Sequence, residues 1–303
     1  MRRVSCAAPA KINLALHVTG RRADGYHELE TLVAFSPIGD RIHVDEGEPG
    51  ELRLTGPFAG GLSSGADNLA LRAERALREA VGGDPPAVAM TLEKNLPVAG
   101  GLGGGSADAA ATLIALKAWW RLPESFDLFP VAESLGADVP MCLASQPLLA
   151  CGKGERIRPL RDLAAHPMVL VNPGVALSTP SVFAALQRRD NPPVDLAGDA
   201  FPDIGALCLL RNDLEPAAKA LQPIIADALA LLGAQAGCRM ARMSGSGASC
   251  FALFDDAAAA GAARAAIIDS RPHWWCVATQ LMPGAMTQRL CEHQPTATSG
   301  TTR

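Results

Sequence analysis

The residues best suited to chemistry form a glycine-rich loop between an expected strand and an expected helix. Five glycines lie between Gly100 and Gly105, interrupted only by Leu102, and Ser106 follows them. A backbone without side chains can wrap closely around a ligand, and a helix N-terminus presents unpaired N–H groups and the positive end of its dipole. The segment therefore predicts an anion-binding loop, with a nucleotide phosphate as its ligand.

Other well-known phosphate-binding motifs do not fit this loop. A P-loop needs a lysine before its Ser or Thr, and none precedes Ser106. The dinucleotide-binding and protein-kinase loops need G-x-G-x-x-G, whose last place is taken here by Ser106, and the H-R-D and D-F-G signatures are absent. A flexible linker is the competing interpretation, but linkers are seldom embedded between a strong strand and a strong helix.

The stretch from Pro97 to Ser106 resembles the ATP-binding motif of the GHMP kinases, which phosphorylate small metabolites. Further segments resemble this family in its own order: Pro9-Ala10-Lys11-Ile12-Asn13-Leu14, Asp24-Gly25-Tyr26-His27-Glu28-Leu29, Gly136-Ala137-Asp138-Val139-Pro140 and Met243-Ser244-Gly245-Ser246-Gly247-Ala248. The resemblance implies a kinase that moves the γ-phosphoryl of ATP, with Mg²⁺, onto a hydroxyl of an isoprenoid precursor carrying a cytidine diphosphate. A GHMP kinase acting on mevalonate or homoserine, and a non-catalytic binding module on the same fold, are the alternatives.

Two residues are expected to carry the catalysis. Phosphoryl transfer needs a group that accepts the proton of the acceptor hydroxyl, and Asp138 is the candidate. Its alternative is a helix-capping or turn aspartate. Lys11 enters an otherwise apolar strand, where a lone lysine is costly unless it is paired, although a solvated strand end is the simpler explanation. The resemblance implies that Lys11 and Asp138 form a pair in which the lysine keeps the carboxylate ionised and stabilises the forming alkoxide.

The resemblance also implies the residues that bind the cytidine-bearing substrate. Tyr26 and Phe183 are expected to sandwich the cytosine ring while His27 reads its polar edge, because stacking and edge hydrogen bonds are how proteins read a free base. Asn13 and Thr179 are expected to contact the rest of the substrate, beside Asp138. Tyr26 could instead be an exposed loop tip, and Phe183 an ordinary core residue.

For ATP, the resemblance places Asn68 and Lys94 near the adenine. Their alternatives are a helix cap and a solvated strand residue. The phosphates are expected within the loop residues Pro97, Gly100, Gly101, Leu102, Gly103, Gly104, Gly105 and Ser106, with Gly245 and Gly247 narrowing the cleft. No clustered carboxylates identify magnesium ligands, so the metal site is left unassigned.

Hydrophobic patterns predict the elements that position these residues. Extended runs are expected at 12–18, 30–35 and 40–44, then a helix at 68–80 and a strand at 88–93 that leads into the glycine loop. The next helix is expected to begin with Ser106 as its N-cap and to end near Leu122. Strands at 168–171, 238–243, 249–254 and 276–281, with a helix at 256–268, suggest a split α/β sandwich.

The resemblance implies an α/β (α+β) fold of two domains with the active site in the cleft between them. Residues 1–160 are expected to form an N-terminal domain like the second domain of ribosomal protein S5. Residues 161–285 are expected to form a ferredoxin-like split α/β domain. The Thr-, Ser-, Gln- and Pro-containing residues 286–303 show no periodicity and are predicted to be a disordered tail.

Composition excludes several other classes of protein. A formal charge of -4 without a Lys/Arg block argues against nucleic acid as a partner. No apolar run of about 18 residues indicates a membrane span, and no signal-peptide core follows Met1-Arg2-Arg3. The eight cysteines are scattered without a C-x-x-C pair, which favours reduced thiols in a cytoplasmic protein. A small-molecule substrate is the expected partner, and both a monomer and a homodimer remain open.

Overall fold

A computed structural model describes residues 2–48, 50–196, 198–285 and 289–293. Its first sheet has the strand order β11-β1-β2-β4-β3, with β5 paired to β2 and β6 paired to β5. All neighbouring strands in it are antiparallel except β3 and β4. Its strands are β1 (Arg3–Arg21), β2 (His27–Glu46), β3 (Glu51–Thr55), β4 (Val88–Glu93), β5 (Leu148–Gly152), β6 (Arg156–Pro159) and β11 (Leu290–His293).

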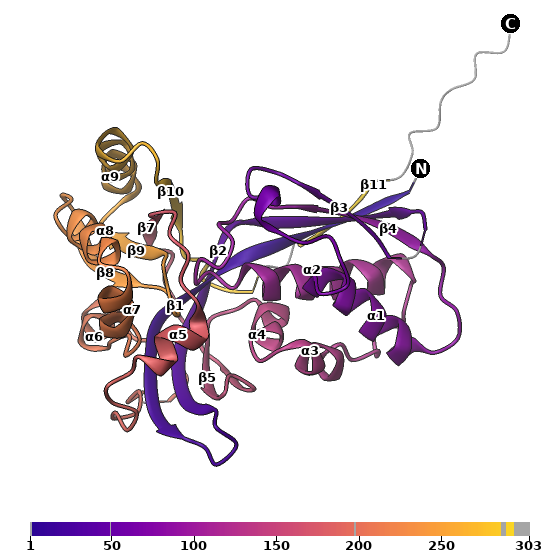
Figure 1. Ribbon diagram of the computed structural model, residues 1–303, viewed down its shortest axis with the longest axis horizontal. Coiled ribbons are helices and arrows are strands. Elements are labelled where there is room, and N and C mark those ends of the chain that lie inside the picture. Colours follow the sequence, from indigo (N-terminus) through magenta and orange to yellow (C-terminus); the bar gives the residue numbers. More distant parts are fainter. Residues whose placement is uncertain (1, 49, 197, 286–288, 294–303) are drawn as a thin grey trace, which may run out of the picture.

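Four helices cover one face of this sheet (Figure 1). They are α1 (Leu69–Val81), α2 (Gly104–Trp119), α3 (Phe129–Leu135) and α4 (Val139–Ala144), and a 3-10 turn spans Ala59–Gly61. Helix α2 packs against both β1 and β2. Its buried alanines, among them Ala109, Ala110 and Ala111, let its backbone lie close to the sheet. The sheet therefore holds the beginning of α2, and with it the end of the glycine loop, in a defined place.

Strands β1 and β2 form one long hairpin that serves both halves of the molecule. The extended runs predicted at 12–18, 30–35 and 40–44 are parts of these two strands, which bend at irregularities in their register such as that between Pro9 and Ala10. Gly39 faces that bend, where a Cβ would lie 2.0 Å from the Ala8 carbonyl oxygen, so no larger residue fits. Near the tip of the hairpin, Leu16 and Val18 pack with residues of the second sheet and its helices.

The second sheet is antiparallel throughout and has the order β10-β7-β9-β8. It consists of β7 (Pro167–Asn172), β8 (Cys238–Met243), β9 (Cys250–Phe254) and β10 (Trp275–Gln280). In chain order this is fourth-first-third-second, the arrangement of a ferredoxin-like split fold, which confirms the prediction for this part of the chain. Its helices are α5 (Thr179–Ala184), α6 (Ile204–Leu209), α7 (Glu215–Leu221), α8 (Ile224–Gly233) and α9 (Ala257–Ser270).

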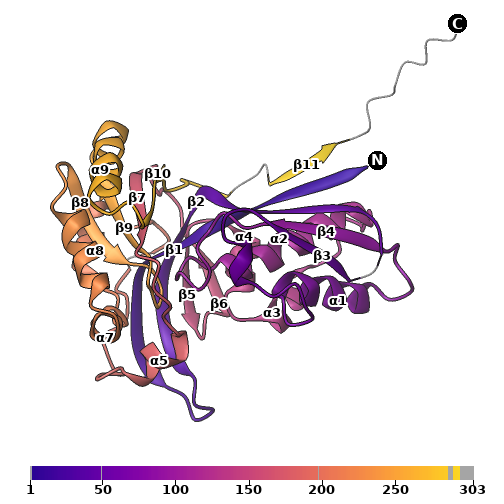
Figure 2. The same cartoon turned by 45° about the horizontal axis from the view of Figure 1, so that its top comes forward.

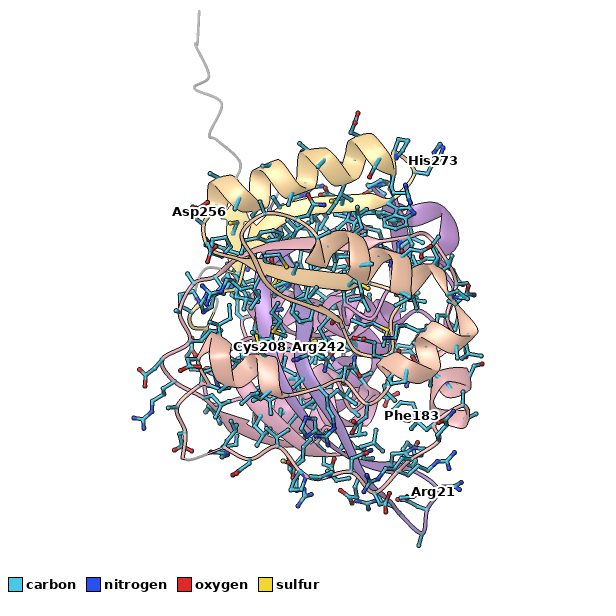
Figure 3. The ribbon with its side chains drawn as sticks, turned by 90° about the vertical axis from the view of Figure 1, so that its left-hand side faces the viewer. Arg21, Phe183, Cys208, Arg242, Asp256 and His273 are labelled. Atoms are coloured by element: carbon cyan, nitrogen blue, oxygen red, sulfur yellow. The ribbon has the colours of Figure 1, made fainter. Side chains whose placement is uncertain are left out.

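The two faces of this sheet have different partners because successive side chains of a strand point to opposite sides. Val169 and Val171 pack on the helix side, where α8 and α9 cover the sheet (Figure 3). Met168 and Leu170 face the other way and share a core with Ile12 of β1. The predicted domain boundary at residue 160 falls between β6 and β7, and the two sheets meet across this shared core.

The C-terminal prediction is wrong for part of the segment. Leu290–His293 form β11, which pairs with β1 so that Leu290 lies opposite Cys6 (Figure 2). The edge of β1 offers unpaired backbone groups to which this short segment can hydrogen-bond. The local sequence of the segment does not reveal this pairing. Residues 286–288 and 294–303 lie outside the described residues. All eight cysteines are free thiols. No helix in the described part of the chain is long and apolar enough to cross a membrane.

Candidate active site

The glycine loop runs from the end of β4 into α2, and its glycines are required by close approaches. Gly103 is the N-cap of α2 with φ of 66°, and a Cβ there would lie 2.8 Å from the Lys11 side chain. The prediction that Ser106 is the N-cap is therefore wrong. The helix begins at Gly104, because only a glycine fits the left-handed turn over Lys11. Ser106 lies in the first turn instead.

The second glycine loop, Ser244 to Gly247, docks directly on the first. The Ser244 hydroxyl donates to the Gly101 carbonyl (2.9 Å) and accepts from the Asn13 backbone N–H (3.1 Å). The Ser249 N–H donates to the Gly100 carbonyl (3.0 Å). Gly101 has φ of 75°, and a Cβ on it would lie 2.3 Å from the Ser244 carbonyl oxygen. Ser244 thus joins β1, the phosphate loop and the second domain, a role that the sequence did not single out.

Lys11 and Asp138 lie together, as predicted. The Lys11 Nζ is 3.0 Å from Asp138 Oδ2 and donates to Asn13 Oδ1 at 2.9 Å. The lysine side chain is 5% exposed whereas that of Asp138 is 41% exposed. The interpretation of Lys11 as a solvated residue at a strand end is therefore wrong. Asp138 occupies the N-cap position of α4, but its carboxylate makes no capping bond. A buried ammonium thus holds a carboxylate that remains open to the cavity.

Lys94 lies in a second buried charge cluster, beneath the N-terminus of α2. Its ammonium contacts Asp40 and lies 2.7 Å from Asp108 Oδ2, so the solvated strand residue considered for Lys94 is also wrong. Asp40 Oδ1 accepts from the backbone N–H groups of Asn95 and Leu96 (2.6 and 2.9 Å), which pins the segment entering the glycine loop.

Asp108 is the member of this cluster whose pKa is raised most clearly. Burial raises the pKa of Asp108 to about 8, and the nearby charge of Asp40 adds to this, against the opposing effect of Lys94. Its Oδ1 has no hydrogen-bond partner among the described residues. Asp40 and Asp108 thus share the Lys94 ammonium. Neither Asp108 nor Asp40 was predicted as a site residue from the sequence.

Asn68 is the N-cap residue of α1, which was the alternative role given to it. Its side-chain oxygen accepts from the Ala70 N–H at the start of α1 (2.9 Å), and its amide donates to the Ser63 carbonyl (2.8 Å). Asn68 still lines the cavity beside Ser63 and Leu69. Its predicted place near the adenine stays a prediction.

A cavity of about 680 Å³ lies between the two domains and brings most of the predicted residues together. Predicted residues that line it are Lys11, Asn13, Asn68, Lys94, Pro97, Gly100, Gly101, Gly103, Gly104, Gly105, Ser106, Asp138, Thr179, Phe183 and Gly245. Leu102 does not line it; this residue is buried, and its carbonyl accepts from the Lys11 N–H (2.9 Å). Thr31, Lys153 and Ser246 line it although they were not predicted.

The predicted base-binding residues gather where α5 meets the tip of the β1–β2 hairpin. Phe183 lies at this edge of the second domain, on the same side as Arg21 (Figure 3). Its ring stacks on that of His27, with centroids 4.8 Å apart, so no third ring fits between them. Tyr26 is 59% exposed, and the Lys153 ammonium lies 5.2 Å from its ring centroid. Tyr26 and His27 are not part of the cavity wall, so the predicted Tyr26–Phe183 sandwich is not assembled here.

His27 carries a ring nitrogen that the neighbouring residues leave unpaired. Its Nε2 is buried without a hydrogen-bond partner in the described part of the chain. Burial lowers the pKa of His27, and the positive charges of Arg189 and Arg21 lower it further. The imidazole is therefore neutral near pH 7, with one nitrogen able to donate and the other able to accept.

The protein itself offers little for a metal ion. Among the described residues, no group of three or more His, Cys, Asp or Glu side chains could hold one. Magnesium in nucleotide sites often keeps several waters and binds mainly through phosphate oxygens.

A glycine loop at a helix N-terminus, a Lys–Asp pair and a cavity between these two domains define a GHMP-type kinase. The model of the GHMP kinases N terminal domain matches residues 68–146, and that of the GHMP kinases C terminal region matches residues 194–271. The chain is 55% identical over 282 residues to the 4-diphosphocytidyl-2-C-methyl-D-erythritol kinase of Paracoccus denitrificans, covering 91% of this chain and 96% of that protein. The chain belongs to the 4-diphosphocytidyl-2-C-methyl-D-erythritol kinase family.

Solved structures agree with this assignment. A crystal structure of 4-(cytidine 5'-diphospho)-2C-methyl-D-erythritol kinase is 39% identical with a TM-score of 0.76, covering 91% of this chain and 98% of that one. A homoserine kinase from Cytophaga hutchinsonii has a TM-score of 0.69 at 19% identity and covers 96% of this chain and 97% of that one. At that identity the homoserine kinase shows the fold alone.

Proposed function

We propose that the protein transfers the γ-phosphoryl of ATP to the 2-hydroxyl of 4-diphosphocytidyl-2-C-methyl-D-erythritol, in the non-mevalonate route to isoprenoid precursors. The observation that carries the proposal is the Lys11–Asp138 pair, which opens on a cavity beside the glycine loop at the start of α2. The 55% identity to a kinase named for this substrate selects the acceptor.

Asp138 acts as the general base in this proposal. Its exposed carboxylate can approach the acceptor hydroxyl and take its proton as the phosphoryl group arrives. Lys11 is held by Asn13 on one side and by Asp138 on the other, so its ammonium has a defined position. A fixed positive charge there stabilises the forming alkoxide.

The glycine loop and the first turn of α2 bind the triphosphate. Gly103, Gly104 and Gly105 line the cavity at the helix N-terminus, where free N–H groups and the helix dipole attract an anion. An Mg²⁺ ion bound with ATP would supply neutralisation of charge on the transferring phosphoryl group. Asn68 and Lys94 lie toward the adenine end, with Lys94 also anchoring the loop through its two carboxyl partners.

The cytidine part of the substrate binds at the tip of the β1–β2 hairpin. The unpartnered Nε2 of His27 supplies a hydrogen bond to the polar edge of cytosine. Phe183 and Tyr26 supply apolar ring faces, with Tyr26 turning inward over the base. Thr179 and Asn13 line the path from there to Lys11, where the diphosphate and the methylerythritol lie.

A small-molecule substrate is the sole partner we propose, in the cytoplasm. Eight free thiols suit a reducing compartment, and the charge of -4 gives nucleic acid no attraction. The alternative acceptors homoserine and mevalonate rest on fold likeness alone. A non-catalytic module would not need both Lys11 and Asp138 in contact.

A coupled ADP-release assay with ATP and Mg²⁺ tests the proposal. Turnover is expected with 4-diphosphocytidyl-2-C-methyl-D-erythritol and not with mevalonate or homoserine. Turnover with one of the other alcohols would retain the phosphoryl-transfer chemistry and overturn the assignment of the cytidine site. Absence of turnover with all three, in folded protein that binds ATP, would favour the non-catalytic module.

A further inference from the structure

Arg289 returns from the second domain to the far end of the helix that carries the proposed base. Its guanidinium is buried, and Nη1 donates to the carbonyls of Cys142 (2.9 Å) and Leu143 (3.4 Å) in the last turn of α4. Its Nε donates to the Ala7 carbonyl (3.1 Å), and the Ala7 N–H donates to the Arg289 carbonyl (2.9 Å). One side chain thereby connects β1, α4 and the start of β11.

The surroundings of this guanidinium are unusual for a buried cation. No carboxylate pairs with it in the described residues, and burial lowers the pKa of Arg289. An unpaired buried charge is expensive, and the three carbonyl acceptors of Nε and Nη1 offset part of this cost, while Nη2 has no partner among the described residues. The same carbonyls need the arginine, because the last carbonyls of a helix have no partner within it. The helix dipole also favours a cation at this end.

Helix α4 depends on contacts at its ends. It has six residues, too few for its internal hydrogen bonds to stabilise it alone. Its N-cap residue is Asp138, held on the cavity side by the ion pair to Lys11. A helix of this length spans about 9 Å, so movement of its C-terminal turn is transmitted to Asp138. A misplacement of about 1 Å at a reacting group can reduce a rate a hundredfold.

We propose that Arg289 is a positioning residue for phosphoryl transfer: by fixing the C-terminal turn of α4, it holds Asp138 against Lys11 at the cavity. This inference rests on the proposed role of Asp138 as the base. It assigns a function to the C-terminal segment, which lies well outside both matched family models.

The experiment compares Arg289→Met, which keeps the length of the side chain, with Arg289→Lys, which keeps its charge. Arg3→Ala is the matched control, because Arg3 lies on β1, the strand that Arg289 contacts at Ala7, but pairs with Asp45 at the surface. In Arg289→Met, kcat is expected to fall about 10- to 100-fold, with the KM values for ATP and the alcohol within about threefold of wild type. Arg289→Lys is expected to recover part of kcat, and Arg3→Ala to match wild type.

An unchanged kcat in folded Arg289→Met would overturn the proposal. So would a fall in kcat matched by both KM values and by loss of thermal stability, because that pattern belongs to a purely structural arginine. If Arg289→Met does not fold, the kcat and KM values of Arg289→Lys decide in the same way. Each ratio is measured with whichever alcohol the wild-type protein phosphorylates, so an error in the substrate assignment does not affect this test.

Discussion

At the scale of single residues, burial assigns different tasks to two similar charge pairs. Lys11 is buried but its partner Asp138 is open to the cavity, whereas Lys94 and both of its carboxyl partners are enclosed. An open carboxylate can exchange a proton with a bound hydroxyl. A carboxylate that is almost fully buried instead ties backbone segments together, as Asp40 does by accepting from the N–H groups of Asn95 and Leu96. The first pair is therefore suited to catalysis and the second to holding the glycine loop.

Removal of the proposed base tests this division. In Asp138→Ala, kcat is expected to fall about 10²- to 10⁴-fold, because no other carboxylate contacts Lys11 in the described structure. ATP affinity, measured by titration calorimetry, should stay within a few fold. Asp227→Ala on the exposed side of α8 is the control. Wild-type turnover in folded Asp138→Ala would contradict the assignment.

The Lys94 cluster predicts a dependence of stability on pH. The pKa of Asp108 is raised from 3.8 to about 8 in the folded protein, so the unfolded chain releases this proton at a lower pH than the native one. The native state binds more protons between these values, and its stability therefore falls as the pH rises from about 4 to about 8. Asp108→Asn keeps the shape of the side chain and removes this contribution.

Urea unfolding of both proteins at pH 5 and pH 8 measures the effect. The free energy of unfolding of wild type minus that of Asp108→Asn is expected to be smaller at pH 8 than at pH 5. Taking the difference cancels the titration of other groups, such as His43 and His166. Equal differences at the two pH values would show that Asp108 is ionised throughout.

At the scale of elements, the site is a seam between two glycine loops. Two carbonyls of the first loop accept hydrogen bonds from the second loop and the residue just beyond it. The Gly100 carbonyl accepts from the Ser249 N–H, and the Gly101 carbonyl accepts from the Ser244 hydroxyl. The approach is so close that a side chain on Gly101 would displace the second loop. The phosphate loop is therefore shaped by the second domain as well as by the helix that follows it.

Substitution of Gly101 tests this seam. Gly101→Ala introduces both a clash with Ser244 and a strained positive φ, so it is expected to destabilise the protein by about 1–3 kcal/mol and to raise KM for ATP. Gly261→Ala in α9 is the control, since its Cβ meets open space. That change should stabilise the protein by about 0.5–1 kcal/mol. Normal ATP kinetics in Gly101→Ala would mean that the loop does not need this contact.

At the scale of the whole molecule, the β1–β2 hairpin unites the two domains. Its tip packs in the core of the second sheet, and its middle shares a further core with β7 and β9. Neither sheet buries its apolar face completely without the other. This arrangement keeps the walls of the cavity together although they come from segments far apart in the chain.

The shared core predicts a single cooperative unfolding transition. Trp119 and Trp120 report on the first domain, while Trp274 reports on the second and Trp275 on its contact with Phe58 of the first. Replacing both tryptophans of one pair by Phe leaves the fluorescence of the other pair. For each variant, the midpoint of thermal unfolding measured by this fluorescence should equal the midpoint measured by circular dichroism of the same variant. Separate midpoints would indicate domains that unfold independently.

Much of this protein is determined locally. The strand at 88–93 is found as predicted, and the helix after the glycine loop begins within two residues of the expected start. Both follow from short-range patterns that the backbone must obey wherever the segment lies. The ordered motifs around Lys11, Gly100 and Asp138 resemble those of the GHMP kinases, and this resemblance supplied most of the predicted residues that line the cavity.

Tertiary structure alone decided the contacts made across the chain. The burial of Lys94 between two carboxyl groups, the docking of Ser244 on the glycine loop and the return of Arg289 to α4 each join segments separated by many residues. Such contacts leave no periodic signal, because hydrogen bonds and ion pairs depend on distance in space and not on spacing in sequence. Residue types therefore identified the chemistry, and the fold determined which groups are enclosed, which are open and which hold others in place.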